Sequence, residues 1–139
     1  MLYSPPISEI MSTNIIAVNR DDDLETAELL FKKHKIRHIP VVNGDVIIGM
    51  LSYSDLLRIS FADAVFEDES EVDALVYNMF TIDQVMVKHV VTVPADSTIK
   101  EVAEILSKNE FHALPVVDDG NLVGIVTTTD LINYLLKQL

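Results

Sequence analysis

The chain has 139 residues, 49% of them hydrophobic, which suits one compact domain or two closely packed halves and excludes a disordered chain. Its net charge of −12 argues against nonspecific nucleic-acid binding, which depends on neutralising phosphates. Cysteine is absent, which excludes disulfides and thiolate metal sites, and no apolar run approaches the about 20 residues of a membrane helix. The first six residues do not resemble a signal peptide, and the absence of cysteine fits the cytoplasm, so we expect a cytoplasmic protein with no membrane partner.

The sequence repeats itself, since residues 7–57 align with residues 82–132 at a constant offset of 75 and without a gap. Identical residues occupy 11 of the 51 paired positions. They include a proline, a glycine and an aspartate from each copy: Pro40 and Pro115, Gly49 and Gly124, Asp55 and Asp130. A unit of this size buries too little apolar surface alone, so two copies should pack against each other. We predict repeat 1 over 1–59, a connector over 60–80 and repeat 2 over 81–139.

Each repeat begins with a short apolar stretch, at 15–18 and 90–93, which predicts a β-strand. Helical periodicity follows, and Asp23 and Thr98 occupy the N-cap positions of the two predicted helices. The acidic run at 21–23 is therefore better explained as a helix start than as a metal site.

The second and third strands of each repeat form a hairpin, at 40–51 and 115–126. Pro40 and Pro115 are predicted to open the second strand, where no ladder donor is required. Glycine with asparagine or aspartate supplies the turn that joins the two strands.

A last helix closes each repeat, and Ser54–Asp55 and Thr129–Asp130 are predicted to cap it. The order is thus β-α-β-β-α, twice, a mixed α/β fold of the α+β type. The acidic stretch 60–80 between the copies also carries apolar residues, which predicts a partly helical connector that packs on the core or on a partner chain.

The junction between the third strand and the last helix carries the strongest functional pattern. It reads Gly-x-x-Ser-x-Ser-Asp at 49–55 and Gly-x-x-Thr-x-Thr-Asp at 124–130. Free N–H groups at a helix N-terminus favour phosphate, and nearby hydroxyls can donate to the same oxygens. Asp55 or Asp130 can accept both vicinal hydroxyls of a ribose, while flanking valines and isoleucines can hold a base. The alternative is a plain N-cap, but recurrence of the whole hydroxyl pattern in both copies favours a nucleotide.

Four of the ten basic residues fall within six positions, Lys32, Lys33, Lys35 and Arg37, so an anionic ligand should bind first in this region. The alternative is that this run is only the solvated end of a helix.

Other chemistries have weaker support in the sequence. His34 and His38 are spaced for a metal on a helix, but no third ligand is near, and Pro40 predicts that the helix ends before His38. The sequence has no recognisable nucleophile with a base, Walker loop or dinucleotide glycine pattern, so we predict neither a metal site nor an enzyme.

With these features the chain resembles a pair of cystathionine-beta-synthase (CBS) domains, a Bateman module, over practically its whole length apart from the connector. The resemblance implies two repeats packed with pseudo-twofold symmetry around two clefts that bind adenosine-containing ligands, such as AMP, ADP, ATP or S-adenosylmethionine. It further implies a regulatory role and a homodimer of modules, and we expect no required cofactor. Because the two repeats and the connector leave no room for an effector domain in the 139 residues, we expect the output to act on an effector protein in trans or through oligomerisation.

The family pattern also assigns residues to the two clefts. The first cleft combines the junction of repeat 2 with residues of repeat 1: Thr127, Thr129, Asp130, Ile16, Arg37 and His38. The second combines the junction of repeat 1 with residues of repeat 2: Ser52, Ser54, Asp55, Val91, His112 and Ala113. Since the second set lacks an arginine before the proline, the first cleft is the better predicted phosphate site, and the second holds a less charged adenosyl ligand or nothing. The alternative function is a ligand-free oligomerisation or scaffold module that binds through its acidic connector.

Overall fold

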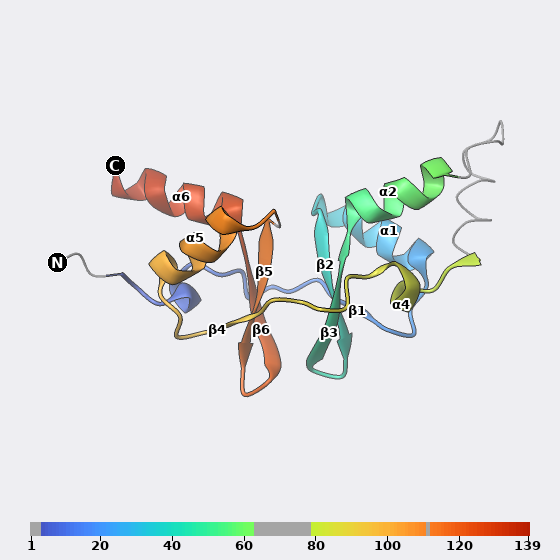
Figure 1. Cartoon of the computed structure of the whole chain (residues 1–139), viewed down its shortest axis with the longest axis horizontal. Coiled ribbons are helices and arrows are strands. Elements are labelled where there is room, and N and C mark those ends of the chain that lie inside the picture. The colour runs from blue at the N-terminus through green and yellow to red at the C-terminus, as the bar shows by residue number, and fades with distance from the viewer. Residues whose placement is uncertain (1–3, 63–78, 111) are drawn as a thin grey trace. The chain divides into compact units, whose positions relative to one another are not determined.

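The computed structural model describes residues 4–62, 79–110 and 112–139 (Figure 1). The chain divides into two compact units. The first-repeat unit contains Ile16–Val90, and the second-repeat unit contains Val91–Leu139 together with Met1–Ile15. The predicted connector falls largely on 63–78, outside the described residues.

The first-repeat unit is a three-stranded sheet with helices. Its elements are β1 (Val18–Asn19), α1 (Leu24–His34), β2 (His38–Asn43), β3 (Val46–Ser52), α2 (Tyr53–Ala62) and α4 (Ile82–Val85). β1 runs parallel to β2, which pairs antiparallel with β3. In Figure 1 the turn of the β2–β3 hairpin points away from α1 and α2. Apolar residues of both helices and all three strands form the buried core, and Ile82 of α4 completes it.

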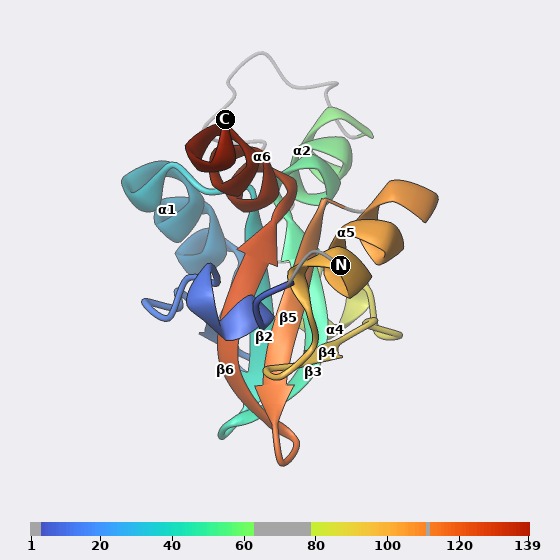
Figure 2. The ribbon, with the colours of Figure 1, turned by 90° about the vertical axis from the view of Figure 1, so that its left-hand side faces the viewer.

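The second-repeat unit has the same topology. Its elements are η1 (Ile7–Glu9), β4 (Val93–Pro94), α5 (Ile99–Lys108), β5 (Ala113–Asp118), β6 (Asn121–Thr127) and α6 (Thr128–Gln138). β4 runs parallel to β5, and β5 and β6 form the antiparallel hairpin that faces the viewer in Figure 2. The predicted β-α-β-β-α order and mixed α/β class are therefore confirmed.

The prediction for the first two strands of each repeat was partly wrong. β1 and β4 have two residues each, because Val18 pairs with Val41 and Val93 with Val116. One step earlier the partner would be Pro40 or Pro115, which has no N–H to extend the ladder. β2 and β5 themselves begin two residues before these prolines, at His38 and Ala113. The prolines are tolerated inside the strands because β1 and β4 do not extend alongside them, so no backbone N–H is needed there.

The compact units and the sequence repeats differ in their leading segments. Ile7, from the start of the chain, is fully buried in the core of the second-repeat unit, and its N–H donates to Ser97 O at 2.6 Å. Ile82, the equivalent residue of repeat 2, is fully buried in the first-repeat unit. Arg20 holds the same α4 segment through a hydrogen bond of 2.9 Å to Asp83, which raises the pKa of Arg20. Each unit thus includes the leading segment of the other repeat.

Candidate functional site

The junction of β6 and α6 positions the first group of predicted site residues. Thr127 is the N-cap of α6, and its hydroxyl accepts from the N–H of Asp130 at 3.1 Å. The Asp130 carboxylate accepts in return from the N–H of Thr127 at 2.9 Å, so the two residues form a capping box. The other carboxylate oxygen of Asp130 has no hydrogen-bond partner among the described residues.

The junction of β3 and α2 shares one of these two bonds. The Ser52 hydroxyl accepts from the N–H of Asp55 at 3.0 Å, as Thr127 does from Asp130. The Asp55 carboxylate lies 3.2 Å from Arg58, one turn further along α2. In both repeats a hydroxyl therefore satisfies one of the free N–H groups of the helix N-terminus.

These bonds correct the predicted helix caps. Ser52 and Thr127 cap the last helices, two residues before the predicted Ser54 and Thr129. The helices start earlier because the strand leads into the helix without an intervening loop. Ser54 and Thr129 consequently lie exposed in the first helical turn, where their hydroxyls can meet a ligand.

The residues before each proline lie beside the junction of their own repeat. The carbonyl of Arg37 accepts from the N–H of Tyr53 at 2.9 Å, and His38 pairs with Ser52 across the hairpin. In the second-repeat unit the carbonyl of His112 accepts from the N–H of Thr128 at 2.9 Å, and Ala113 pairs with Thr127.

The remaining predicted site residues precede the short first strands. Ile16 is half-buried before β1, and Val91 is exposed before β4. Each predicted cleft combines residues of both units, and their assembly into clefts stays a prediction.

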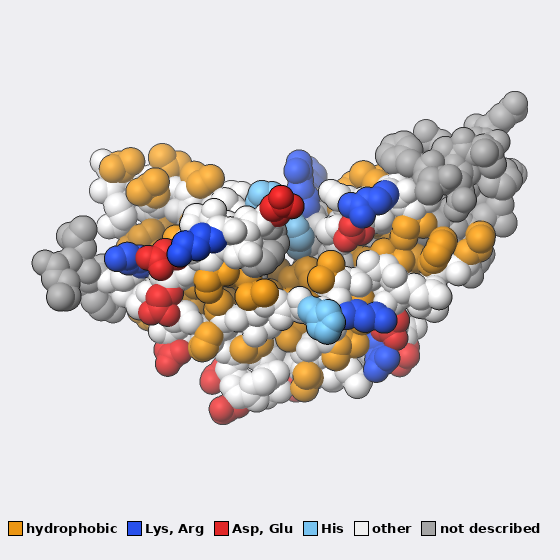
Figure 3. Space-filling model, in the orientation of Figure 1, with side chains coloured by type: hydrophobic (Ala, Val, Ile, Leu, Met, Phe, Trp, Pro, Cys, Tyr) orange, Lys and Arg blue, Asp and Glu red, His pale blue; other side chains and the backbone are white. Residues whose placement is uncertain are grey.

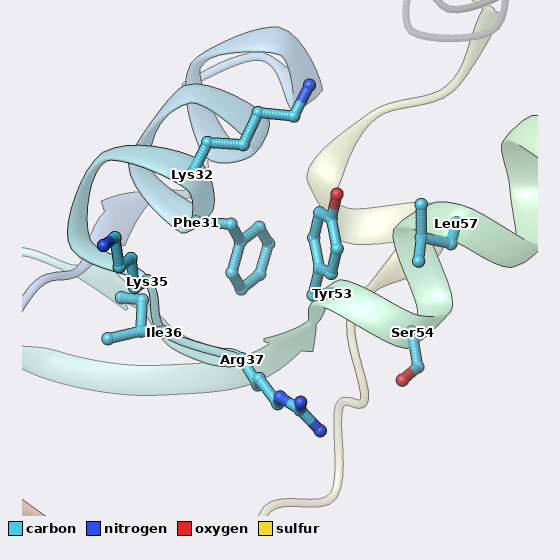
Figure 4. Close-up of a pocket in the computed structure, with 8 residues that line it drawn as sticks. All are labelled: Phe31, Lys32, Lys35, Ile36, Arg37, Tyr53, Ser54 and Leu57. Carbon is cyan, nitrogen blue, oxygen red and sulfur yellow. The ribbon is translucent and has the colours of Figure 1, made fainter.

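The first-repeat unit contains a pocket of about 460 Å³ between α1 and α2 (Figure 4). Its lining combines bases, aromatic rings and aliphatic side chains: Phe31, Lys32, Lys35, Ile36, Arg37, Tyr53, Ser54 and Leu57. The pocket brings together Arg37 and Ser54, which the family pattern assigns to different clefts. It also contains bases of the run in which an anionic ligand was predicted to bind first.

The aromatic residues of this pocket were missed by sequence reasoning. The rings of Phe31 and Tyr53 contact each other with centroids 5.3 Å apart and an interplanar angle of 55°. Phe31 lies near the end of α1 and Tyr53 begins α2, so the sequence separates residues that the fold joins. A comparison of the two repeats could have found this pair. Phe31 and Tyr53 are aromatic, whereas the residues 75 positions later, Leu106 and Thr128, are not.

The metal alternative rested on His34 and His38. His34 ends α1 and His38 begins β2, so the prediction that the helix ends before His38 is confirmed. The structure shows no group of three or more His, Asp or Glu residues suited to a metal within the part of the chain that it describes.

Comparison with known proteins identifies the fold that carries these junctions. The family model of the CBS domain matches residues 7–62 and 82–137. The chain belongs to the CBS-domain family. The two matches are the two repeats, so the chain carries a CBS pair, or Bateman module, as its resemblance implied.

Relatives and a solved structure agree with this membership. Protein MJ1426 of Methanocaldococcus jannaschii is 33% identical over 94% of this chain and 90% of its own length. An inosine-5′-monophosphate dehydrogenase of Thermoplasma acidophilum is 30% identical over 88% of this chain, but over only 22% of the dehydrogenase. The CBS pair of protein MJ0100, solved with 5′-methylthioadenosine and S-adenosyl-L-methionine, is 26% identical with a TM-score of 0.77, covering 99% of this chain and 100% of that one.

The match to the dehydrogenase is thus a match to a minor part of that enzyme.

Among the helices that the structure describes for this CBS pair, none is long and apolar enough to cross a membrane.

Proposed function

We propose that the protein is a cytoplasmic regulatory module that binds an adenosine-containing ligand, AMP, ADP, ATP or S-adenosylmethionine, in clefts formed by its two repeats. The observation that carries the proposal is the hydroxyl–aspartate junction, because the Ser52 and Thr127 hydroxyls accept from the N–H groups of Asp55 and Asp130 in the same way. Each junction offers an exposed hydroxyl, a carboxylate and a helix N-terminus, which suit a ribose and a phosphate.

The CBS pair of MJ0100 supports this choice of ligand, because it binds 5′-methylthioadenosine and S-adenosyl-L-methionine and aligns with nearly the whole chain. The first cleft is the proposed phosphate site, since Arg37 and His38 stand where the second cleft has His112 and Ala113. A less charged adenosyl ligand suits the second cleft.

The proposed output is a change in contacts rather than a reaction, so the module is neither an enzyme nor dependent on a cofactor. A ligand can favour one packing of the chain only if it binds that packing more tightly. We propose that the favoured packing alters contacts with an effector protein in trans or with a second copy.

Thermal denaturation with AMP, ADP, ATP and S-adenosylmethionine tests ligand binding. A ligand at 100 times its dissociation constant stabilises the folded chain by about 2.7 kcal/mol, which raises the melting temperature by several degrees. If none of these ligands raises the melting temperature, the proposed sensor function is wrong and the ligand-free scaffold alternative is favoured.

Asp130→Asn is the variant that tests the ribose role. Asparagine keeps an oxygen that accepts from Thr127 N–H, whereas alanine would also remove this half of the capping box and lower the stability without ligand. We expect Asp130→Asn to lose most of the ligand-induced shift, measured from its own baseline. An undiminished shift would exclude a ribose contact at Asp130.

An exposed apolar face on α6 supports the homodimer. Four residues at helical spacing, Ile132, Leu135, Leu136 and Leu139, are each more than half exposed, and Figure 3 shows apolar side chains gathered over α6. Leu57, equivalent to Ile132, is also exposed on α2.

We propose that a second copy of the chain covers this face. Light scattering coupled to size exclusion should show a dimer for the natural chain and a monomer for Leu135→Asp. Lys137→Asp on the same helix serves as the matched control and should stay dimeric. A natural chain that is monomeric at all concentrations would contradict this part of the proposal.

A further inference from the structure

Met11 and Met86 occupy equivalent places in the leading segments, residues 7–12 and 82–87. Each closes a helical turn, because its N–H donates to the carbonyl of the fully buried Ile7 or Ile82, at 3.0 and 2.9 Å. Each side chain is half-buried and packs against the core of its own unit. We propose that these two methionines are oxidation sites, and that conversion of their thioethers to sulfoxides by a peroxide releases the ends of the segments that they hold.

The sulfur of each methionine lies directly against the backbone of a strand. A Cβ on Gly124 of β6 would overlap the Met11 sulfur and lie 2.9 Å from its Cγ and 3.1 Å from the carbonyl oxygen of Ser12. Met86 stands in the same relation to Gly49 of β3. The thioether thus fills the place of a missing side chain, and the contact leaves no room for a further atom on that side of the sulfur.

Oxidation changes the chemistry of this contact. With hydrogen peroxide, a sulfur lone pair attacks one oxygen, the O–O bond breaks, and the displaced hydroxide takes the proton of the newly attached hydroxyl and leaves as water. The sulfur is oxidised to a sulfoxide and the peroxide is reduced. A sulfoxide is polar, so leaving it in an apolar contact is unfavourable, whereas water satisfies it once the segment has opened.

Exposure separates the methionines that the structure describes. Met79 is 66% exposed and Met50 only 8%, while Met11 and Met86 lie between these limits. Hydrogen peroxide should therefore oxidise Met79 first, Met11 and Met86 next, and Met50 last. Because the chain has no cysteine, no thiol of its own competes with these thioethers for the oxidant.

Each leading segment is held at two points, of which only one depends on the sulfur. The buried isoleucine is the first point and lies one turn before the methionine. Directly after the methionine, Ser12 exchanges backbone hydrogen bonds of 2.8 and 3.0 Å with Ile125 of β6. Val87 is bonded in the same way to Met50 of β3. Oxidation should therefore open the end of each segment while the isoleucine stays in the core.

The ends that open lie next to the proposed ligand junctions. Ile125 and Met50 precede the capping residues Thr127 and Ser52 by two positions along β6 and β3. Opening therefore loosens the part of each strand that leads into the last helix, so oxidation can act on the junctions. That consequence rests on the proposed function, whereas oxidation and opening require no ligand.

Limited treatment of the full chain with hydrogen peroxide tests the proposal. Peptide mass spectrometry should find sulfoxide at Met11 and Met86 before Met50. In NMR hydrogen exchange, the four amides that bond the leading segments to β3 and β6 should then exchange about ten-fold faster, as expected when a buried polar group lacks a partner. The Ile7 amide, which donates to Ser97, should keep its protection.

Three results would overturn the proposal. The first is a failure of Met11 and Met86 to react before Met50. The second is unchanged exchange at the four amides although both methionines are oxidised. The third is equal acceleration at the Ile7 amide, which would show that the whole unit unfolds. None of these results depends on an adenosyl ligand, so failure of the sensor function and failure of this proposal are distinguishable.

Met11→Leu and Met86→Leu form a matched pair, because each removes one thioether and keeps the other. After peroxide treatment, Met11→Leu should open only beside β3, and Met86→Leu only beside β6. Norleucine in place of all five methionines keeps the unbranched side chain without its sulfur, and that chain should not respond to peroxide. Faster exchange of the same amides in the peroxide-treated norleucine chain would exclude the methionine sulfurs as the cause.

Discussion

The side chain of Met86 occupies the space that a Cβ on Gly49 would need. A Cβ at Gly49 would overlap the Met86 sulfur and lie 2.9 Å from its Cγ and 3.0 Å from the carbonyl oxygen of Val87. The second-repeat unit repeats the relationship with Met11 and Gly124. The glycine that both repeats share thus lets the segment around Met86 approach β3, and the segment around Met11 approach β6. Beside β3, Met50 and Val87 exchange backbone hydrogen bonds of 3.0 and 2.9 Å.

Gly49→Ala should lower the free energy of unfolding by about 1–3 kcal/mol, because the added methyl overpacks this contact. Urea denaturation of the full chain measures the loss. In the double variant Gly49→Ala/Met86→Ala, the total loss should be smaller than the sum of the two single losses, since the sulfur is no longer displaced. Strictly additive losses would contradict a direct contact.

Ile7→Ala tests the exchange of leading segments. Ile7 is fully buried in the core of the second-repeat unit, so its truncation should cost about 2–5 kcal/mol. Hydrogen exchange should show lost protection first in residues 91–139, although Ile7 belongs to the first repeat of the sequence. Ile82→Ala is the mirror control and should first affect residues 16–62. Lost protection in 16–62 for Ile7→Ala would contradict the observed units.

The repeat, the order of elements and the hairpins could be predicted because each leaves a local signal in the sequence. Periodicity marks α1 and α5, and Gly44 with Gly120 supplies the positive φ of the hairpin turns. Contacts between distant segments leave no such signal. Neither the docking of Ile7 beside Ser97 nor the pairing of Phe31 with Tyr53 could be predicted from spacing. The caps were misplaced because Ser52 and Ser54 are both good capping residues, and only the backbone decides between them.

Thr127→Ala and Thr129→Ala should separate the structural from the ligand-binding hydroxyl. Thr127 caps α6 through its bond to Asp130 N–H, so its loss should cost about 1 kcal/mol. Thr129 is exposed in the first turn of α6, so its replacement should change the stability by less than about 0.5 kcal/mol. The same replacement should weaken binding of the proposed adenosyl ligand. Thermal denaturation with and without ligand measures both effects. A larger stability loss for Thr129→Ala would contradict the observed cap.

Asp23 should make α1 sensitive to acid. Its side chain accepts from the Thr26 hydroxyl at 2.7 Å and from the Thr26 N–H at 2.8 Å, and these bonds lower the pKa of Asp23 from its usual value. A carboxyl whose pKa is lower in the folded state stabilises the fold above its unfolded pKa. That stabilisation is lost as the pH falls through the folded value.

Asp23→Asn is the control for this prediction, because asparagine is an equally good N-cap and does not titrate. The natural chain should lose stability relative to Asp23→Asn, measured as the free energy of unfolding, as the pH falls from about 5 to about 2. Urea denaturation at several pH values measures it. A difference that is constant with pH would show that the Asp23 carboxylate contributes no charge-dependent stability.

Lys35→Gly should make the chain more stable. Lys35 is the C-cap of α1 and has φ of 54°, a conformation that glycine adopts without the steric cost that lysine has there. The free energy of unfolding should therefore rise by up to about 1 kcal/mol, measured by urea denaturation of the full chain. Lys35→Gln is the matched control, because it removes the same charge but keeps a side chain at this backbone position, and it should show no such gain. Equal changes in stability for the two variants would show that the effect comes from the lost charge and not from the left-handed backbone.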